Sequence, residues 1–358
     1  MEAASPLRRR DLHLSFLTLL LGLLMFDSAA AAPAKWALVV HGGAGTIDRG
    51  ELKPEQERAY RAAMTQATEA GAAVLRSGGR ALDAVETVVR ILEDDPLFNA
   101  GRGAVFTADG KNELDAAIME GREMKAGAVA GVTRTRHPIT LARTVMERSP
   151  HVFLIGDGAD AFARSQRLEQ VDPSWFFTER RWRSLEKSLK AQGLPIPPRP
   201  AGAPLAPDAA AALAHDEGKH GTVGVAALDV HGDVAAGTST GGTTAKRWGR
   251  VGDSPIVGAG VYASNRSCAV SATGAGEYFI RLTVAREVCA LVEYKGLSLQ
   301  AAVDQVVQKE LPAIGGDGGV IAVAPDGQVA WSFNTSGMYR ARISDASPLV
   351  VGIYKDDP

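Results

Sequence analysis

A glycine–threonine junction, Gly221-Thr222, constrains the fold of this chain more than any other feature of its sequence. The residues before it are irregular and rich in Pro and Ala, and a clean strand pattern begins at Thr222. A hydroxyl placed after a Gly carbonyl is able to attack it, which leaves a Thr whose free α-amino group serves as its own base. Because many strands begin with Thr, the junction alone favours an ordinary strand start, and the rest of the chain has to decide.

Composition excludes several classes of protein. The chain has 358 residues, of which 46% are apolar and 22% charged, enough to bury a large core. Its formal net charge of −2 and the absence of a basic run after the N-terminus argue against nucleic acid as a partner. Paired glycines such as Gly42-Gly43 and Gly241-Gly242 are typical of close backbone approach.

The N-terminus has the pattern of a signal peptide, for which we predict residues 1–34. Arg8-Arg9-Arg10 precedes an apolar run over residues 14–26, which is short for a membrane span, and small residues suited to cleavage follow it. A retained membrane anchor is the alternative. We expect an exported protein, periplasmic or secreted, with no membrane contact after removal of the signal.

Export permits a disulfide between the two cysteines of the chain, Cys268 and Cys289. Two buried free thiols agree with the sequence equally well. Neither Cys lies in a zinc pattern, and the His residues of the chain body lack metal-binding spacing. No G-x-S-x-G or P-loop occurs.

Hydrophobic periodicity predicts a mixture of helices and strands with frequent hairpins. We expect helices at residues 54–76, 81–92, 139–148, 158–167, 276–294 and 298–311. We expect strands at residues 36–40, 105–106, 113–119, 127–133, 152–155, 222–229, 233–240, 256–262, 268–273, 319–323, 329–333 and 349–354. Hairpins are expected at residues 105–119 and 222–240, and a mobile Pro/Ala-rich linker at about 185–220. Such hairpins favour an α/β (α+β) fold of stacked sheets covered by helices over a doubly wound parallel sheet.

Two motifs after the junction suit the binding of an amino acid. The hairpin brings Thr240 close to Thr222, where its hydroxyl could orient a nucleophile. Arg250 and Asp253 lie three residues apart in a Gly-rich turn, and together they would hold a carboxylate and an ammonium group. Taken singly, an edge strand and a structural ion pair explain these residues as well.

A third motif, residues 271–277, lies at a strand-to-helix turn. The Thr273 hydroxyl and the Gly274 N–H there would form an oxyanion hole at a helix N-terminus. A simple helix cap is the alternative.

Together these motifs resemble the plant-type asparaginase and isoaspartyl peptidase family of N-terminal nucleophile (Ntn) hydrolases. The resemblance covers essentially the whole mature chain. Its motifs are His41-Gly42-Gly43-Ala44-Gly45, Pro96-Leu97-Phe98-Asn99-Ala100-Gly101, Glu113-Leu114-Asp115-Ala116, Gly127-Ala128-Val129, Ser149-Pro150-His151-Val152, Gly221-Thr222-Val223-Gly224 and residues 238–242, 249–255, 273–277 and 333–339. So many matches in order reverse the preference for an ordinary strand start at Thr222.

The resemblance implies a four-layer αββα sandwich made as a precursor. Thr222 would attack the Gly221 carbonyl, so that residues 35–221 become an α-subunit and residues 222–358 a β-subunit of one structural domain, assembled as an (αβ)₂ heterotetramer. The mature enzyme would hydrolyse L-asparagine and β-aspartyl dipeptides through a threonyl ester on Thr222.

The resemblance also assigns the site. Thr240 would bind the nucleophile, Thr273 and Gly274 would form the oxyanion hole, and Asn99 would support the cleavage region. Arg250 would clamp the α-carboxylate, and Asp253 and the Gly276 carbonyl would bind the α-ammonium. No cofactor is expected for catalysis, but a structural sodium ion is expected on backbone carbonyls. Those carbonyls belong to Leu92, Glu93, Asp95, Phe98, Ala100 and Arg102.

Two rival functions remain open. A glycosylasparaginase typically has Asp-Thr at the cut, whereas this chain has Gly221-Thr222. An uncleaved exported amino-acid-binding protein would use Arg250 and Asp253 without chemistry. A denaturing gel separates the second rival from the enzyme, because only the enzyme divides into two bands.

Overall fold

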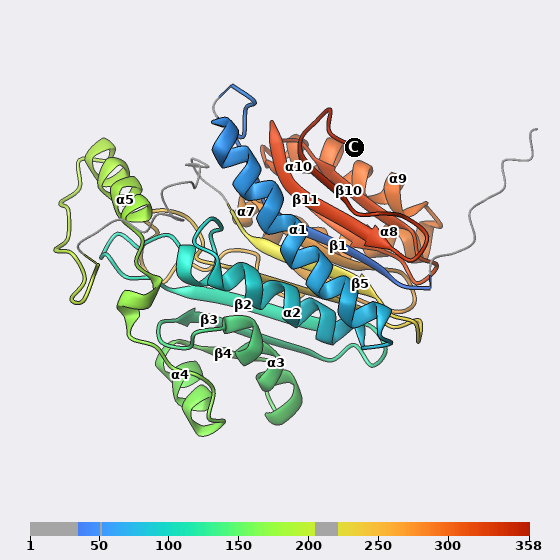
Figure 1. The fold of residues 1–358 in the computed structure, drawn as a ribbon, viewed down its shortest axis with the longest axis horizontal. Coiled ribbons are helices and arrows are strands. Elements are labelled where there is room, and N and C mark those ends of the chain that lie inside the picture. The colour runs from blue at the N-terminus through green and yellow to red at the C-terminus, as the bar shows by residue number, and fades with distance from the viewer. Residues whose placement is uncertain (1–34, 51, 205–220) are drawn as a thin grey trace, which may run out of the picture. The chain divides into compact units, whose positions relative to one another are not determined.

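Two β-sheets lie face to face in this computed structural model, which describes residues 35–50, 52–204 and 221–358 (Figure 1). The larger sheet has eight strands in the order β12-β11-β1-β5-β6-β2-β3-β4. Their bounds are β1 Ala37–Gly45, β2 Leu114–Glu120, β3 Ala126–Val132, β4 Phe153–Ile155, β5 Val223–Leu228, β6 Val234–Thr240, β11 Gly337–Ser344 and β12 Val350–Tyr354. All neighbouring pairs are antiparallel except β3 and β4.

The smaller sheet has four antiparallel strands in the order β10-β9-β8-β7. Their bounds are β7 Val261–Ala263, β8 Ala269–Gly274, β9 Gly318–Val323 and β10 Val329–Phe333. The strands of both sheets are mostly buried, in keeping with their Val- and Ala-rich sequences.

Helices cover the outer face of each sheet (Figure 1). Those on the larger sheet are α1 Pro54–Arg76, α2 Ala81–Asp94, α3 Pro138–Arg148 and α4 Gly156–Ser165. Those on the smaller sheet are α7 Gly276–Leu282, α8 Val284–Lys295 and α9 Leu299–Asp304, which continues as a π-helical turn, Gln305–Glu310, and α10 Leu311–Ala313. Pro54 and Pro138 start α1 and α3, at a position where a missing N–H costs nothing.

Two apolar clusters fill the spaces between these layers. One joins α1, α2 and α3 to the larger sheet, through residues such as Leu38, Val85 and Val225. The other lies between the two sheets and under α8 and α9, through residues such as Val39 and Val270. The predicted αββα sandwich is confirmed.

The predicted subunits share the larger sheet. Strands β1 to β4 precede Gly221, and β5, β6, β11 and β12 follow it, with β1 hydrogen-bonded between β5 and β11. Cleavage after Gly221 would therefore leave the two pieces interleaved in one sheet. The predicted signal peptide and the end of the predicted linker lie outside the described residues. Among the residues that the structure describes, no helix has the length and apolar character needed to span a membrane.

Several local predictions were wrong. Residues 105–106 form no strand, so the expected hairpin to β2 is absent; β2 pairs with β3 and β6 instead. The helix expected over residues 276–294 is broken at Thr283, whose φ is +49°. The linker expected from about 185 begins later, because α5 (Glu179–Ala191) packs Trp182 and Leu185 against Phe106 and Phe177. Strand β11 was not predicted.

The two cysteines are joined. Cys268 lies just before β8 and Cys289 lies in α8, and a disulfide links them in the buried layer between strand and helix. The sequence had left free thiols as an equal alternative.

Candidate active site

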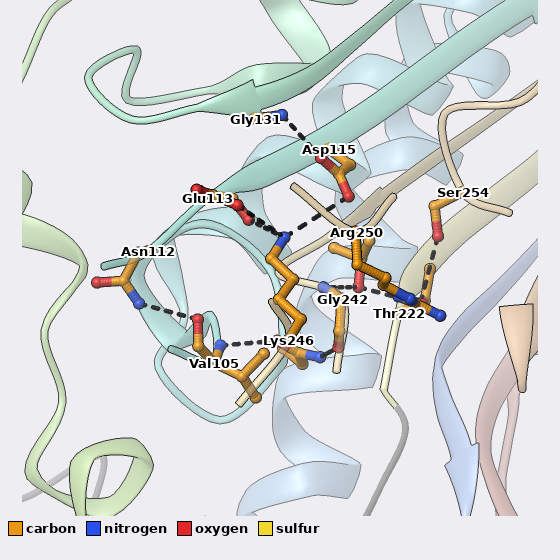
Figure 2. A network of polar contacts seen from close by, with 12 residues as sticks. Val105, Asn112, Glu113, Asp115, Gly131, Thr222, Gly242, Lys246, Arg250 and Ser254 are labelled. Carbon is orange, nitrogen blue, oxygen red and sulfur yellow. Dashed lines mark hydrogen bonds and ion pairs between the residues drawn. The ribbon is translucent and has the colours of Figure 1, made fainter. Parts of the chain in front are cut away.

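Thr222 lies immediately before β5 and is buried, with 6% of its surface exposed. Its hydroxyl donates to Thr240 Oγ1 at 3.2 Å and lies 3.5 Å from Ser254 Oγ (Figure 2). Thr240 ends β6, the strand that pairs with β5. The hairpin therefore brings the two Thr side chains together, as the sequence predicted.

The Gly221 carbonyl is held by two side chains. Asn99 Nδ2 donates to it at 2.8 Å and Thr240 Oγ1 donates to it at 3.0 Å. Since Thr240 also accepts from Thr222, the three groups form a hydroxyl chain that starts at Thr222 Oγ1 and ends on the preceding carbonyl. Two donors on one carbonyl oxygen would stabilise negative charge that develops on it.

Asn99 uses every polar atom of its side chain. Its Nδ2 also donates to the Gly242 carbonyl at 2.8 Å, and its Oδ1 accepts from Val105 N at 3.0 Å. The side chain is 1% exposed. This full set of bonds fixes the amide orientation, so that its N–H groups face the Gly221 carbonyl.

A glycine lets a second segment approach the junction. Gly43 has φ +117°, and a Cβ there would lie 3.1 Å from Gly221 Cα. The backbone of β1 at Gly43 therefore packs directly against Gly221 and Thr222. This contact explains Gly43, whereas a Cβ on Gly42 would lie 2.5 Å from the ring of Phe98.

A cavity opens beside Thr222. Its lining residues are Gly221, Thr222, Thr240, Gly242, Thr243, Arg250, Gly252, Asp253, Ser254 and Gly274. A cation and a carboxyl group from one turn therefore face the same small space as the Thr222 hydroxyl. Gly276 borders these groups: a Cβ there would lie 2.9 Å from Asp253 Oδ1 and 3.0 Å from Arg250 Nη2.

Arg250 already holds a carboxylate. Its Nε and Nη2 donate to the two carboxylate oxygens of Glu277 at 2.9 and 3.0 Å, the two-point geometry in which Arg binds a carboxylate. The Glu277 side chain is 62% exposed and the Arg250 side chain 18% exposed. Because the Glu277 side of this pair is open to solvent, a ligand carboxylate would reach Arg250 by displacing Glu277.

Two titratable groups of the site are shifted by burial. Burial raises the pKa of Asp253 to about 7, although the positive charge of Arg250 acts in the opposite direction. Burial also lowers the pKa of His41 to about 3, so this imidazole is neutral. His41 Nε2 lies 2.7 Å from Ser271 Oγ, and its ring faces the main chain of Thr222.

The predicted oxyanion-hole residues lie at the end of β8. Gly274 lines the cavity, whereas Thr273 is fully buried beside it and accepts a hydrogen bond from Ala44 N at 3.3 Å. The structure thus gathers all the predicted catalytic and binding residues around Thr222. The chemical role of each residue stays a prediction.

Sequence reasoning gave no role to Ser254, Ser271 or Lys246. Ser254 and Ser271 lie inside motifs that the sequence singled out, but only their proximity to Thr222 and His41 draws attention to them. Lys246 is almost fully buried behind Gly242. A buried Lys in a loop has no signature in the sequence.

The predicted sodium loop follows α2. Helix α2 ends at Asp94, so the Leu92 and Glu93 carbonyls lie in its last turn, where no helical N–H reaches them. The loop is coiled tightly: a Cβ on Gly101 would lie 2.2 Å from Glu93 O, and one on Gly103 1.9 Å from Phe98 O. The Glu93 and Phe98 carbonyls, two of the six predicted ligands, therefore lie directly against Gly101 and Gly103. Within the described residues no group of three His, Cys, Asp or Glu side chains could hold a metal.

The similarity to known proteins extends over nearly the whole chain after residue 33. The asparaginase family profile matches residues 34–353. An isoaspartyl peptidase of Salmonella typhimurium is 50% identical over 322 residues, which cover 90% of this chain and 99% of that protein. An isoaspartyl peptidase of Escherichia coli is 49% identical over 322 residues, with 90% and 97% covered. A plant-type L-asparaginase of Pyrococcus abyssi is 42% identical over 303 residues, with 84% and 94% covered.

Proposed function

The chain belongs to the asparaginase family, and we propose that it is a self-cleaving hydrolase of L-aspartyl side-chain bonds with Thr222 as its nucleophile. One observation carries this proposal most directly. The Thr222 hydroxyl, the doubly held Gly221 carbonyl and the Arg250–Asp253 pair all face one cavity. The names of the relatives, isoaspartyl peptidase and L-asparaginase, agree with it.

Maturation would begin at the Gly221-Thr222 bond. Thr222 Oγ attacks the Gly221 carbonyl carbon, and the negative charge on the carbonyl oxygen is stabilised by Asn99 and Thr240. The proton lost by Oγ is transferred to the Thr222 nitrogen, which is the leaving group. The C–N bond then breaks and an ester of Thr222 remains. Water hydrolyses this ester, which frees the Gly221 carboxylate and the Thr222 α-amine.

Hydrolysis of the substrate would use the same hydroxyl. The free α-amine of Thr222 removes the proton from its own Oγ, which attacks the side-chain carbonyl of an L-aspartyl unit. Ammonia or an amino acid leaves, and an aspartyl ester forms on Thr222. Water then releases L-aspartate. The Gly274 N–H and the Thr273 hydroxyl would stabilise the oxyanion in both steps.

The substrate would be held by its own zwitterion. Arg250 would exchange Glu277 for the α-carboxylate of the substrate, and Asp253 would bind the α-ammonium together with the Gly276 carbonyl. Both charged groups of the enzyme border Gly276, which matches a ligand whose two charges sit on one carbon. An α-linked aspartyl peptide lacks the free α-carboxylate and would not fit this arrangement.

A sodium ion would play a structural part. Six main-chain oxygens, those of Leu92, Glu93, Asp95, Phe98, Ala100 and Arg102, would hold it in the loop that leads to Asn99. The tight coil of this loop, in which Gly101 and Gly103 lie against the Glu93 and Phe98 carbonyls, supports this assignment. The ion would supply no chemistry, but it would fix the segment that carries the amide of Asn99.

Export and assembly are part of the same proposal. A signal peptide over residues 1–34 and an (αβ)₂ heterotetramer of subunits 35–221 and 222–358 rest on the sequence and on the family resemblance. The interleaved strands of the larger sheet support the idea that the cleaved halves stay together.

The experiment that tests the activity uses matured protein and three substrates. L-Asparagine and β-aspartyl-leucine should be hydrolysed, the β-linked peptide best, and α-aspartyl-leucine should remain intact. Release of ammonia or leucine reports each reaction. Cleavage of the α-linked peptide, or of none of the three, would overturn the proposal.

A further inference from the structure

A buried lysine lies behind the substrate cavity, and the proposed mechanism does not use it. Lys246 follows β6 in the turn that leads to Arg250, and its side chain is 1% exposed. Its Nζ donates to the Glu113 carbonyl at 2.8 Å, at the start of β2 (Figure 2). The side chain thus ties the turn after β6 to the neighbouring strand.

Two carboxylates lie near Lys246 Nζ: Glu113 Oε2 at 4.0 Å, on a side chain that is 27% exposed, and that of the fully buried Asp115. Asp115 Oδ2 lies 3.9 Å from Lys246 Nζ and has no hydrogen-bond partner among the described residues, while its Oδ1 accepts from Gly131 N at 2.9 Å. Asp115 is fully buried and stands opposite Thr240 in the pairing of β2 with β6. The ion pair therefore lies on the strand next to Thr240, which belongs to the hydroxyl chain of the active site.

Lys246 and Arg250 meet at Gly242. A Cβ on Gly242 would lie 3.3 Å from Lys246 Nζ and 3.4 Å from Arg250 Nη1, so the two cations flank one glycine of the cavity wall. Like charges this close repel each other unless an anion lies nearby. Asp115 is the fully buried carboxyl beside Lys246: burial raises its pKa, whereas the charges of Lys246 and Arg250 act to lower it.

Stability alone gives little reason for such a pair. Two buried charges lose their hydration, and an ion pair without a direct hydrogen bond regains only part of it. The position of the ion pair gives a better reason for its presence, because Lys246 fixes the segment that runs from Gly242 to Arg250 to the neighbouring strand. We propose that Asp115 and Lys246 position Arg250, so that its guanidinium meets the α-carboxylate of the substrate.

The test compares two inhibitors in the matured enzyme, and it rests on the proposed function. L-Aspartate carries the α-carboxylate that Arg250 would bind, whereas β-alanine lacks it. In Lys246→Met the inhibition constant for L-aspartate should rise between about tenfold and about a hundredfold, as expected for a displaced binding group. The constant for β-alanine should stay unchanged, and self-cleavage at Gly221 should persist.

Two further variants make the test decisive. Lys111→Met removes the same charge from an exposed side chain in the neighbouring loop and should behave as wild type. If Lys246→Met does not fold, Asp115→Asn/Lys246→Met replaces the pair by neutral groups of similar volume and should show the same loss for L-aspartate.

Two results would overturn the inference: a wild-type constant for L-aspartate in Lys246→Met or in Asp115→Asn/Lys246→Met, or equal weakening of both inhibitors in either of them. Failure of wild-type enzyme to hydrolyse L-asparagine or to bind L-aspartate would count against the proposed function instead.

Discussion

The side-chain amide of Asn99 donates to the carbonyl of Gly221 at 2.8 Å, across 122 residues of sequence. The loop after α2 and the end of the predicted α-subunit thus meet at the bond that the chain would cut. The same oxygen accepts from Thr240. We infer that these two donors activate the peptide bond for attack by its own threonine.

Removal of the Asn99 amide should slow maturation. In Asn99→Ala the Gly221 carbonyl keeps only the Thr240 donor, and loss of one oxyanion donor costs about 10²–10³ in rate. The appearance of two bands on a denaturing gel over time gives that rate. Asn112→Ala is the matched control, because Asn112 bonds to Ala104 and Val105 in the same loop without contacting Gly221. Equal slowing in both variants would remove Asn99 from the cleavage machinery.

Changes at Arg250 and Glu277 should move KM for L-asparagine in opposite directions. Arg250→Lys loses the two-point contact and should raise KM by about tenfold or more. Glu277→Gln replaces the carboxylate that occupies Arg250 by a neutral amide, which competes less well with the substrate. KM should therefore fall by up to about fivefold, which corresponds to the strength of a solvent-exposed ion pair. Steady-state kinetics measures both. A higher KM in Glu277→Gln would show that Glu277 supports the substrate instead of competing with it.

The affinity for L-aspartate should depend on pH through Asp253. Its pKa is raised to about 7 by burial, so the carboxyl is protonated below that pH and cannot neutralise an ammonium group. The inhibition constant of L-aspartate should therefore rise as pH falls through 7, by about tenfold per pH unit well below the pKa. Succinate lacks the ammonium group and serves as the control. Parallel weakening of both inhibitors would assign the effect to another group.

The disulfide should stabilise the layer around β8. Cys268 and Cys289 close a short loop between strand and helix, and a bridge of this size contributes about 3 kcal/mol to the free energy of unfolding. Cys268→Ala/Cys289→Ala should lose that amount in urea denaturation, and a reductant should lower the midpoint of wild type but not that of the variant. An unaffected wild-type midpoint would contradict this.

Much of the architecture could be predicted because its signals are local. Helix α1 runs over Pro54–Arg76 and β10 over Val329–Phe333, the residues predicted from periodicity. The break at Thr283 could not be predicted, since the apolar spacing continues across it from α7 into α8. Strand β11 follows the turn at residues 334–336, and it forms because β1 and β12, which are distant in sequence or follow it, pair with it.

The contacts of the candidate site also differ in whether the local sequence predicts them. The hairpin of β5 and β6 predicts the meeting of Thr222 and Thr240 directly, because antiparallel register follows from the turn. The contacts of Asn99 with Gly221, of Glu277 with Arg250 and of Lys246 with Glu113 join segments distant in sequence. Such contacts depend on how the layers pack, and no local pattern encodes them.

The central claim is that Thr222 cuts the chain before itself. The most direct measurement incubates purified wild-type protein and Thr222→Ala side by side, separates them on a denaturing gel and sequences the N-terminus of the smaller fragment. We predict that wild type divides into two chains, that the new chain begins Thr222-Val223-Gly224, and that Thr222→Ala remains whole. Cleavage of Thr222→Ala at the same bond, or a wild-type chain that stays in one piece after long incubation, would contradict self-cleavage by Thr222.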